Sequence, residues 1–242
     1  MNSLLSTEYP EEVLLSKGVL NIDTVFWADM ILQRSADIPG AVIEKVEHYK
    51  CTDGFEHEFL AVHIDHPLND AASGRKIVLF MERTQRPSPL TILLSSTGSP
   101  PPIPATDVIS ISSPEVLDPI QYITNNHFRH VLISTLQFDD RRPTDRDLSD
   151  LVNFVAAEKP KYDLKYQCYW FSSLIYDALR DIFGGQPTDS EHAEMRGHFY
   201  GRKAPKSEGW AELKSRFKSS TSTPETIKSV SLFVRLSVLI VF

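Results

Sequence analysis

Residues 168–185, CYWFSSLIYDALRDIFGG, form the stretch that decides the fold of this chain. Apolar side chains recur at helical spacing between Phe171 and Phe183, and Gly184 follows directly. Such a stripe predicts an amphipathic helix with one face in the core, and a glycine just past the last turn is a common stop signal. We therefore expect a helix that begins near Cys168 and ends at Gly184.

Four segments upstream of this helix are predicted to be strands. In residues 41–51, AVIEKVEHYKC, apolar and polar side chains alternate, as they do on a strand with two different faces. Residues 57–65 repeat this alternation, residues 74–84 contain an apolar run typical of a buried strand, and residues 130–138 contain HVLISTLQF. The turn Thr52-Asp53-Gly54 separates the first two segments, and we expect an antiparallel meander.

Two further helices complete the expected α+β fold. Residues 21–34, NIDTVFWADMILQR, space their apolar side chains at helical intervals, and Asn21 or Asp23 can cap the start. Another helix is expected to begin after Pro143 and to end before Pro160, because a proline disfavours helical backbone at the residue before it.

The domain organisation follows from length and composition. A chain of 242 residues can bury enough surface to be stable without disulfides or metals. We expect one α+β domain over residues 1–228, with a Pro/Ser-rich exposed excursion at 97–119. Residues 229–242 form an apolar tail that is too short to span a membrane. The tail is a final buried strand or helix, a tail anchor, or an error in the gene model.

Charge and composition exclude several classes of function. The formal net charge is −7, and the lysines and arginines are scattered among carboxylates, so we expect no nucleic-acid partner. The N-terminal segment MNSLLSTEYPEE lacks the pattern of a secretory signal, and no apolar run is long enough for a membrane span. The expected location is therefore cytoplasmic or nuclear, where free thiols are the rule. No phosphate-binding glycine motif occurs, so no cofactor is predicted.

Of the two cysteines, Cys51 and Cys168, the second lies where a catalytic thiol is expected. Cysteine acts as a nucleophile in its thiolate form, which the N-terminus of a helix and a nearby imidazole both stabilise. The N–H groups of the same helix could also stabilise an oxyanion during acyl transfer. The alternative is that Cys168 is a small buried apolar residue, as many free cysteines are.

His57 is the candidate base. It follows a glycine-containing turn and begins an alternating strand, from which an imidazole can lean into a cleft. A strand histidine can equally be structural, so the proposal depends on the approach of His57 to Cys168. A base also needs a polar partner that fixes its tautomer and orientation. The candidates are His63, Asp65 and Glu82, in that order, because His63 shares a strand face with His57, whereas Glu82 depends on the strand register.

The segment YDLKYQCYWF, residues 162–171, resembles the tyrosine followed by N-C-x-x-F at a helix start in circularly permuted papain-like proteins. This group includes the lecithin retinol acyltransferase-like proteins, in which a strand-borne histidine precedes the cysteine. Here Cys168 follows His57 by 111 residues. The resemblance implies a small antiparallel sheet packed on the helix that carries Cys168, and a hydrolase or acyltransferase mechanism through a thioester. It assigns Cys168 as nucleophile and His57 as base.

Two features qualify the resemblance. Gln167 stands where the group often has asparagine, and the third catalytic residue is left open. The combination of HEFL with CYWF is also similar to uncharacterised proteins of mushroom-forming fungi, a resemblance that implies no activity. The expected partner is a peptide, amide or acyl substrate of unknown identity.

Two other functions compete with catalysis. The first is a catalytically inactive interaction domain on the same scaffold, in which Cys168 and His57 serve as packing residues. The second is a structural zinc module built from Cys51, His57, His63 and His66, although their spacing matches no compact zinc motif. The acidic residues between 139 and 147 alternate with arginines, which predicts a solvated, salt-bridged loop.

Overall fold

The computed structural model describes residues 20–34, 40–53, 56–66, 75–85, 105–112, 121, 125, 129–139, 141–158, 167–199, 202–203 and 214–217. The chain divides into two compact units, Met1–Pro205 and Lys206–Phe242. The sheet, the helices and the site described below all belong to the first unit. The predicted domain boundary at residue 228 and the apolar tail 229–242 lie outside the described residues.

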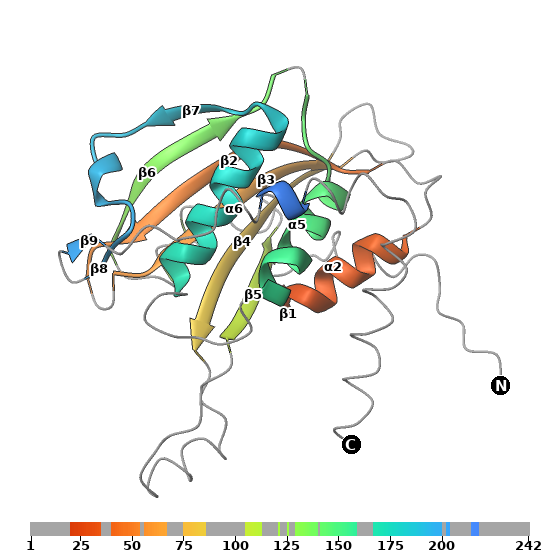
Figure 1. Cartoon of the computed structure of the whole chain (residues 1–242), viewed down its shortest axis with the longest axis horizontal. Helices are drawn as coiled ribbons and strands as arrows, with labels where there is room; N and C mark the ends of the chain where they lie inside the picture. The colour runs from red at the N-terminus through yellow and green to blue at the C-terminus, as the bar shows by residue number, and fades with distance from the viewer. Residues whose placement is uncertain are drawn as a thin grey trace, which may run out of the picture. The chain divides into compact units, whose positions relative to one another are not determined.

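A seven-stranded sheet forms the centre of the first unit (Figure 1), with the strand order β1-β5-β4-β3-β2-β6-β7. All neighbouring strands are antiparallel, which confirms the expected α+β class with an antiparallel meander through β2, β3 and β4. The strands are β1 (Leu20–Asp23), β2 (Val42–Cys51), β3 (Glu58–His66), β4 (Arg75–Gln85), β5 (Ala105–Ser112), β6 (His130–Gln137) and β7 (Gln186–Asp189).

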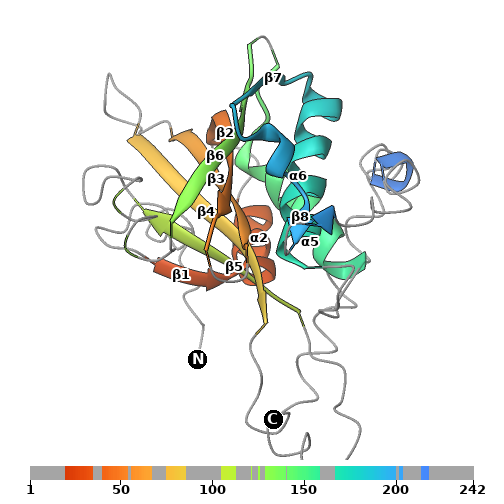
Figure 2. The same cartoon turned by 90° about the vertical axis from the view of Figure 1, so that its left-hand side faces the viewer.

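Three helices form a layer on one side of this sheet (Figure 2). They are α2 (Thr24–Gln33), α5 (Asp145–Glu158) and α6 (Cys168–Phe183). Helix α5 packs between the other two, and α6 lies against β3 and β4. Among the described residues, no helix combines the length and the apolar character needed to cross a membrane. A 3₁₀ turn, η2 (Ala193–Met195), and a small hairpin, β8 (His198–Phe199) with β9 (Arg202–Lys203), follow β7.

The first helix starts later than the sequence predicts. Residues Leu20–Asp23 form β1, and the Asp23 carboxylate accepts hydrogen bonds from the backbone N–H groups of Val25 and Phe26 at 2.9 and 3.2 Å. Asp23 therefore caps α2 and ends the strand at the same point. Of the two predicted caps, Asp23 is confirmed and Asn21 is not, because pairing with β5 holds residues 20–23 in a strand.

The Pro/Ser-rich stretch 97–119 is not an excursion throughout. Its middle part, Ala105–Ser112, is strand β5, which pairs with both β1 and β4. Val108, Ile109 and Ile111 are buried there. The prediction of an exposed segment was wrong for these residues because a strand inside a sheet is buried through its neighbours, whatever the composition of its flanks.

One carboxylate of the acidic segment is buried rather than solvated. Asp145 begins α5, and its carboxylate forms two hydrogen bonds with the Arg34 guanidinium, at 2.8 and 2.9 Å. Both side chains are almost fully buried. This paired contact joins the end of α2 to the start of α5 and corrects the expectation of a solvated loop at this position.

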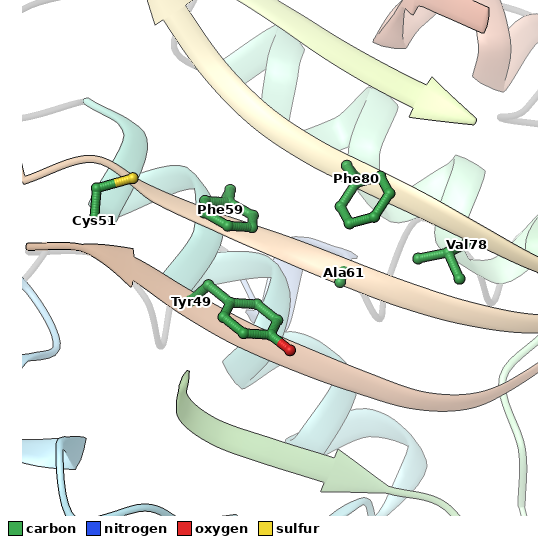
Figure 3. Packing of buried hydrophobic residues seen from close by; sticks show 6 residues of the cluster. All are labelled: Tyr49, Cys51, Phe59, Ala61, Val78 and Phe80. Atoms are coloured by element: carbon green, nitrogen blue, oxygen red, sulfur yellow. The ribbon is translucent and has the colours of Figure 1, made fainter. Parts of the chain in front are cut away.

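The two faces of the central strands have different neighbours. On β4, the Arg83 guanidinium stacks on the rings of Trp170 and Phe171, at 5.0 and 5.2 Å from their centroids, so odd-numbered residues of β4 face α6. Since side chains alternate along a strand, Phe80 and its cross-strand partner Ala61 point to the opposite face. Figure 3 shows the cluster on that face, which comprises Tyr49, Cys51, Phe59, Ala61, Val78 and Phe80.

Candidate active site

Helix α6 places Cys168 at its first residue. Gln167 is the N-cap in extended conformation and makes no side-chain cap hydrogen bond, while its carbonyl accepts from Phe171 N at 3.2 Å. The helix ends at Gly184, whose φ of 74° is left-handed, as expected for a glycine stop. The sulfur of Cys168 therefore lies at the positive end of the helix dipole.

His57 lies immediately before β3, at the end of the sheet where α6 begins. Its carbonyl accepts a hydrogen bond from Cys51 N at 2.7 Å, which joins the ends of β2 and β3. Its imidazole forms a side-chain hydrogen bond with Cys168. Two residues that are 111 positions apart in the sequence are thus in direct contact.

Glu82 of β4 is the carboxylate that meets this imidazole. Glu82 Oε2 lies 2.7 Å from His57 Nε2. Leu60 pairs with Met81 across β3 and β4, so Glu82 falls one residue further along, on the strand face that His57 shares. A long side chain reaches a diagonal neighbour across an antiparallel pair, which explains the contact. The side chains of His57 and Glu82 are 22% and 23% exposed.

The electrostatics favour a protonated His57. Burial by itself lowers the pKa of this imidazole, but hydrogen bonds and attraction to Cys168 and Glu82 outweigh burial and raise the pKa to about 10. His57 is therefore an imidazolium at neutral pH, held between a sulfur and a carboxylate. This state is the one that stabilises a neighbouring thiolate.

The other two candidates for orienting His57 have different partners. His63 Nε2 lies 2.7 Å from Glu47 Oε2, and Asp65 Oδ2 lies 3.3 Å from Lys76 Nζ. His63 shares a strand face with His57. Six residues along a strand span roughly 20 Å, however, so the two side chains are remote from each other. The preference for His63 over Glu82 was wrong because cross-strand neighbours are closer than same-face residues further along one strand.

The two thiols differ in environment although both are buried. Cys168 is 4% exposed, so its sulfur is not openly accessible in this conformation. Burial, reinforced by Cys168 and the nearby carboxylates of Asp53 and Glu82, raises the pKa of Cys51 to about 12. Cys51 is therefore a neutral thiol at pH 7 and provides an internal reference for the reactivity of Cys168.

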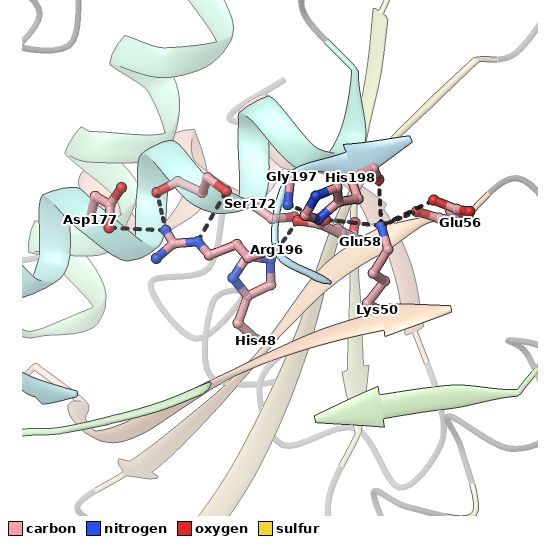
Figure 4. Close-up of polar contacts among 10 residues, drawn as sticks. His48, Lys50, Glu56, Glu58, Ser172, Asp177, Arg196, Gly197 and His198 are labelled. Carbon is pink, nitrogen blue, oxygen red and sulfur yellow. Dashed lines mark hydrogen bonds and ion pairs between the residues drawn. The ribbon is translucent and has the colours of Figure 1, made fainter. Parts of the chain in front are cut away.

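A second polar cluster, not predicted from the sequence, lies on the helix side of the sheet (Figure 4). Its core is His48, Lys50 and Glu58, all fully buried. Glu58 Oε2 lies 3.0 Å from His48 Nε2, and Glu58 Oε1 lies 3.1 Å from Lys50 Nζ. The sequence signal was only that His48 and Lys50 stand two residues apart, and so on one face of a predicted strand, whereas their burial is known from the structure.

This cluster also binds a distant segment of the chain. Gly197 N donates to Glu58 Oε1 at 2.8 Å, and Lys50 Nζ donates to the carbonyl of His198 at 2.6 Å. Arg196 donates to the Asp177 carboxylate on α6 at 2.9 Å. A small cavity of about 310 Å³ lies beside the cluster, lined by Lys50, Glu56, Glu194, Met195 and His198.

The residues of the alternative zinc set do not form a metal-binding group in the part of the chain that the structure describes. Within the described part of the chain, no group of three histidine, cysteine or acidic side chains is arranged to hold a metal ion. Cys51 and His63 of the alternative zinc set instead lie apart, at the end of β2 and in the second half of β3.

Comparisons with protein-family models, with curated proteins and with solved structures found no match for this chain.

Proposed function

We propose that this protein is a thiol-dependent hydrolase or acyltransferase with a permuted papain-like arrangement, in which Cys168 is the nucleophile and His57 the general base. The observation that carries the proposal is that His57 contacts Cys168 and Glu82 at the same time. These three side chains come from α6, the segment before β3, and β4. A nucleophile, a base and a group that orients the base are the parts that covalent acyl transfer requires.

The proposed reaction has two steps. In the first, the thiolate of Cys168 attacks a carbonyl carbon, and the N–H groups at the start of α6 stabilise the oxyanion. The His57 imidazolium then gives its proton to the leaving amine or alcohol as the carbonyl bond to it breaks. In the second, His57 takes a proton from water or another acceptor nucleophile, which attacks the thioester and releases Cys168.

Glu82 has an orienting role in this proposal. It accepts the Nε2 proton of His57, so Nδ1 is the ring nitrogen that exchanges a proton with the sulfur. The carboxylate also stabilises the imidazolium of the resting enzyme, before the first step and after the second. The substrate class is a peptide, an amide or an acyl ester.

The experiment that tests the proposal compares the two cysteines of one protein. Iodoacetamide at pH 7 is expected to label Cys168 at least about tenfold faster than Cys51, because a thiol with a pKa of about 12 is almost wholly protonated. Peptide mass spectrometry gives both rates. His57→Gln should slow the labelling of Cys168 and leave Cys51 unchanged. Incubation with 4-nitrophenyl acetate should place an acetyl group on Cys168, and Cys168→Ser should abolish it.

One observation favours the second candidate function, an inactive interaction domain. Cys168 is only 4% exposed, so a substrate reaches the sulfur only if neighbouring side chains move. If the protein is an inactive interaction domain, Cys168 is labelled no faster than Cys51, and no acetyl group is found. The labelling experiment therefore decides between the two functions.

A further inference from the structure

One buried ammonium group binds both sequence neighbours of His57, the backbone carbonyl of Glu56 and the side-chain carboxylate of Glu58. Lys50 is fully buried on β2, and its Nζ donates to the carbonyl of Glu56 at 3.1 Å and to the carboxylate of Glu58 at 3.1 Å. Its third hydrogen bond is to the carbonyl of His198, at 2.6 Å, and the Glu56 carboxylate lies 3.8 Å away. An ammonium has three N–H donors, so each donor has one acceptor. Two of the three acceptors belong to the residues immediately before and after His57.

The residue before His57 has an unusual backbone conformation. Glu56 has a φ of 50°, and it is the one non-glycine residue with positive φ in the described ranges. A left-handed conformation at a side chain of this kind is strained and persists where surrounding contacts impose it. The hydrogen bond from Lys50 to the Glu56 carbonyl is such a contact. It sets the direction in which the chain enters His57.

The residue after His57 is held as firmly. Burial raises the pKa of Glu58, but the hydrogen bond with His48, the charge of Lys50 and the hydrogen bond from Gly197 N outweigh burial and hold the pKa below its ordinary value. Glu58 is therefore a carboxylate within the core, fully paired. Ser172 Oγ of α6 also donates to the Glu58 carbonyl at 3.2 Å, which links this residue to the helix that carries Cys168. Figure 4 shows Lys50 and Glu58 between β2 and the segment 196–198.

We propose that Lys50 is a positioning residue for His57: by binding the backbone of Glu56 and the carboxylate of Glu58, it aims the imidazole at Cys168. The inference rests on the proposed function of Cys168 and His57. Lys50 does not touch a reacting atom, and its own side chain faces α6 while His57 lies on the other strand face. A purely structural ion pair would stabilise the core without affecting the thiol.

Two variants separate positioning from stability. Lys50→Arg keeps a positive charge beside Glu58, but a planar guanidinium does not reproduce the three-way geometry of an ammonium. The double variant Lys50→Met with Glu58→Gln removes both charges and leaves no uncompensated ion, so it is expected to fold. The matched control is Arg34→Lys, which disturbs another buried ion pair, with Asp145, between α2 and α5.

Three measurements are made on each purified full-length variant: the melting temperature, the iodoacetamide labelling rate of Cys168 at pH 7, and the pKa of His57 by NMR titration. We expect both Lys50 variants to be folded, to label Cys168 at least about tenfold more slowly than wild type, and to move the pKa of His57 down from about 10. Arg34→Lys should lower the melting temperature and leave the labelling rate and the His57 pKa unchanged.

The outcomes distinguish this inference from the proposed function. If wild-type Cys168 is labelled no faster than Cys51, the proposed function fails, while a change of the His57 pKa in the variants still supports positioning by Lys50. If wild-type Cys168 is reactive and both Lys50 variants label at the wild-type rate with an unchanged His57 pKa, the inference is overturned. Unfolding of both Lys50 variants would assign Lys50 to stability and would also overturn it.

Discussion

His57 and Glu82 come from neighbouring strand segments and meet through a 2.7 Å contact between Nε2 and Oε2. The carboxylate attracts the imidazolium and hydrogen-bonds to it, and both effects raise the pKa of His57. In the proposed reaction, the other ring nitrogen exchanges a proton with Cys168, with which the imidazole also interacts. Three residues from separate parts of the chain thus form a connected line of proton donors and acceptors at one end of the sheet.

Glu82→Gln is expected to lower the pKa of His57 from about 10 by about 1 to 3 units, because the amide keeps a hydrogen-bonding side chain but removes the negative charge. An NMR titration of the His57 ring measures this change. Glu47→Gln is the matched control, since Glu47 makes an equivalent 2.7 Å contact with His63. An unchanged His57 pKa in Glu82→Gln would show that Glu82 does not govern the protonation of the base.

His57→Gln is expected to change how stability depends on pH. The folded-state pKa of about 10 lies above the ordinary value of 6.5, so the folded protein binds this proton more tightly than the unfolded chain. The resulting stabilisation is fully present below pH 6.5 and is lost as the pH rises through about 10. Urea unfolding at several pH values should show that the difference in the free energy of unfolding between wild type and variant shrinks from pH 6.5 to pH 10. A difference that does not depend on pH would contradict the raised pKa.

Arg83→Met is expected to destabilise the protein by about 3 to 5 kcal/mol, because it leaves the buried Asp107 carboxylate without its partner. Arg83 Nε lies 2.6 Å from Asp107 Oδ1, and the guanidinium also stacks on Trp170. The double variant Arg83→Met with Asp107→Asn should recover much of this loss. Equal losses for the single and the double variant, measured by urea unfolding, would assign the effect to the lost stacking instead.

Gly185→Ala is expected to cost about 1 to 3 kcal/mol through overpacking. A Cβ at this position would lie 2.7 Å from Leu136 Cγ and 2.8 Å from Phe138 Cε1. Gly184→Ala has open space around it but a φ of 74°, so its expected cost is about 1 kcal/mol from backbone strain alone. Urea unfolding of the two variants should therefore rank Gly185→Ala as the less stable. The reverse order would mean that β6 yields to the added methyl group.

Some parts of the fold were predictable from local patterns. Helix α6 shows a strong apolar period and a glycine stop, and both features act between residues a few positions apart. The same is true of the alternation in β2 and β3, which follows from the period of two along a strand. Strand β5 escaped prediction because its burial depends on pairing with β1 and β4, which no local pattern within its own residues reveals.

The candidate site also combines features that nearby residues determine with contacts that only the tertiary structure determines. The sequence alone determined that Cys168 stands at a helix start and that His57 stands at the entry to a strand, because helix and strand boundaries are marked by nearby residues. The tertiary structure alone decided that Glu82 rather than His63 meets His57, and that Lys50 binds the residues on both sides of His57. These contacts depend on strand register and on the packing of α6 against β3 and β4, and both result from interactions between segments distant in the chain.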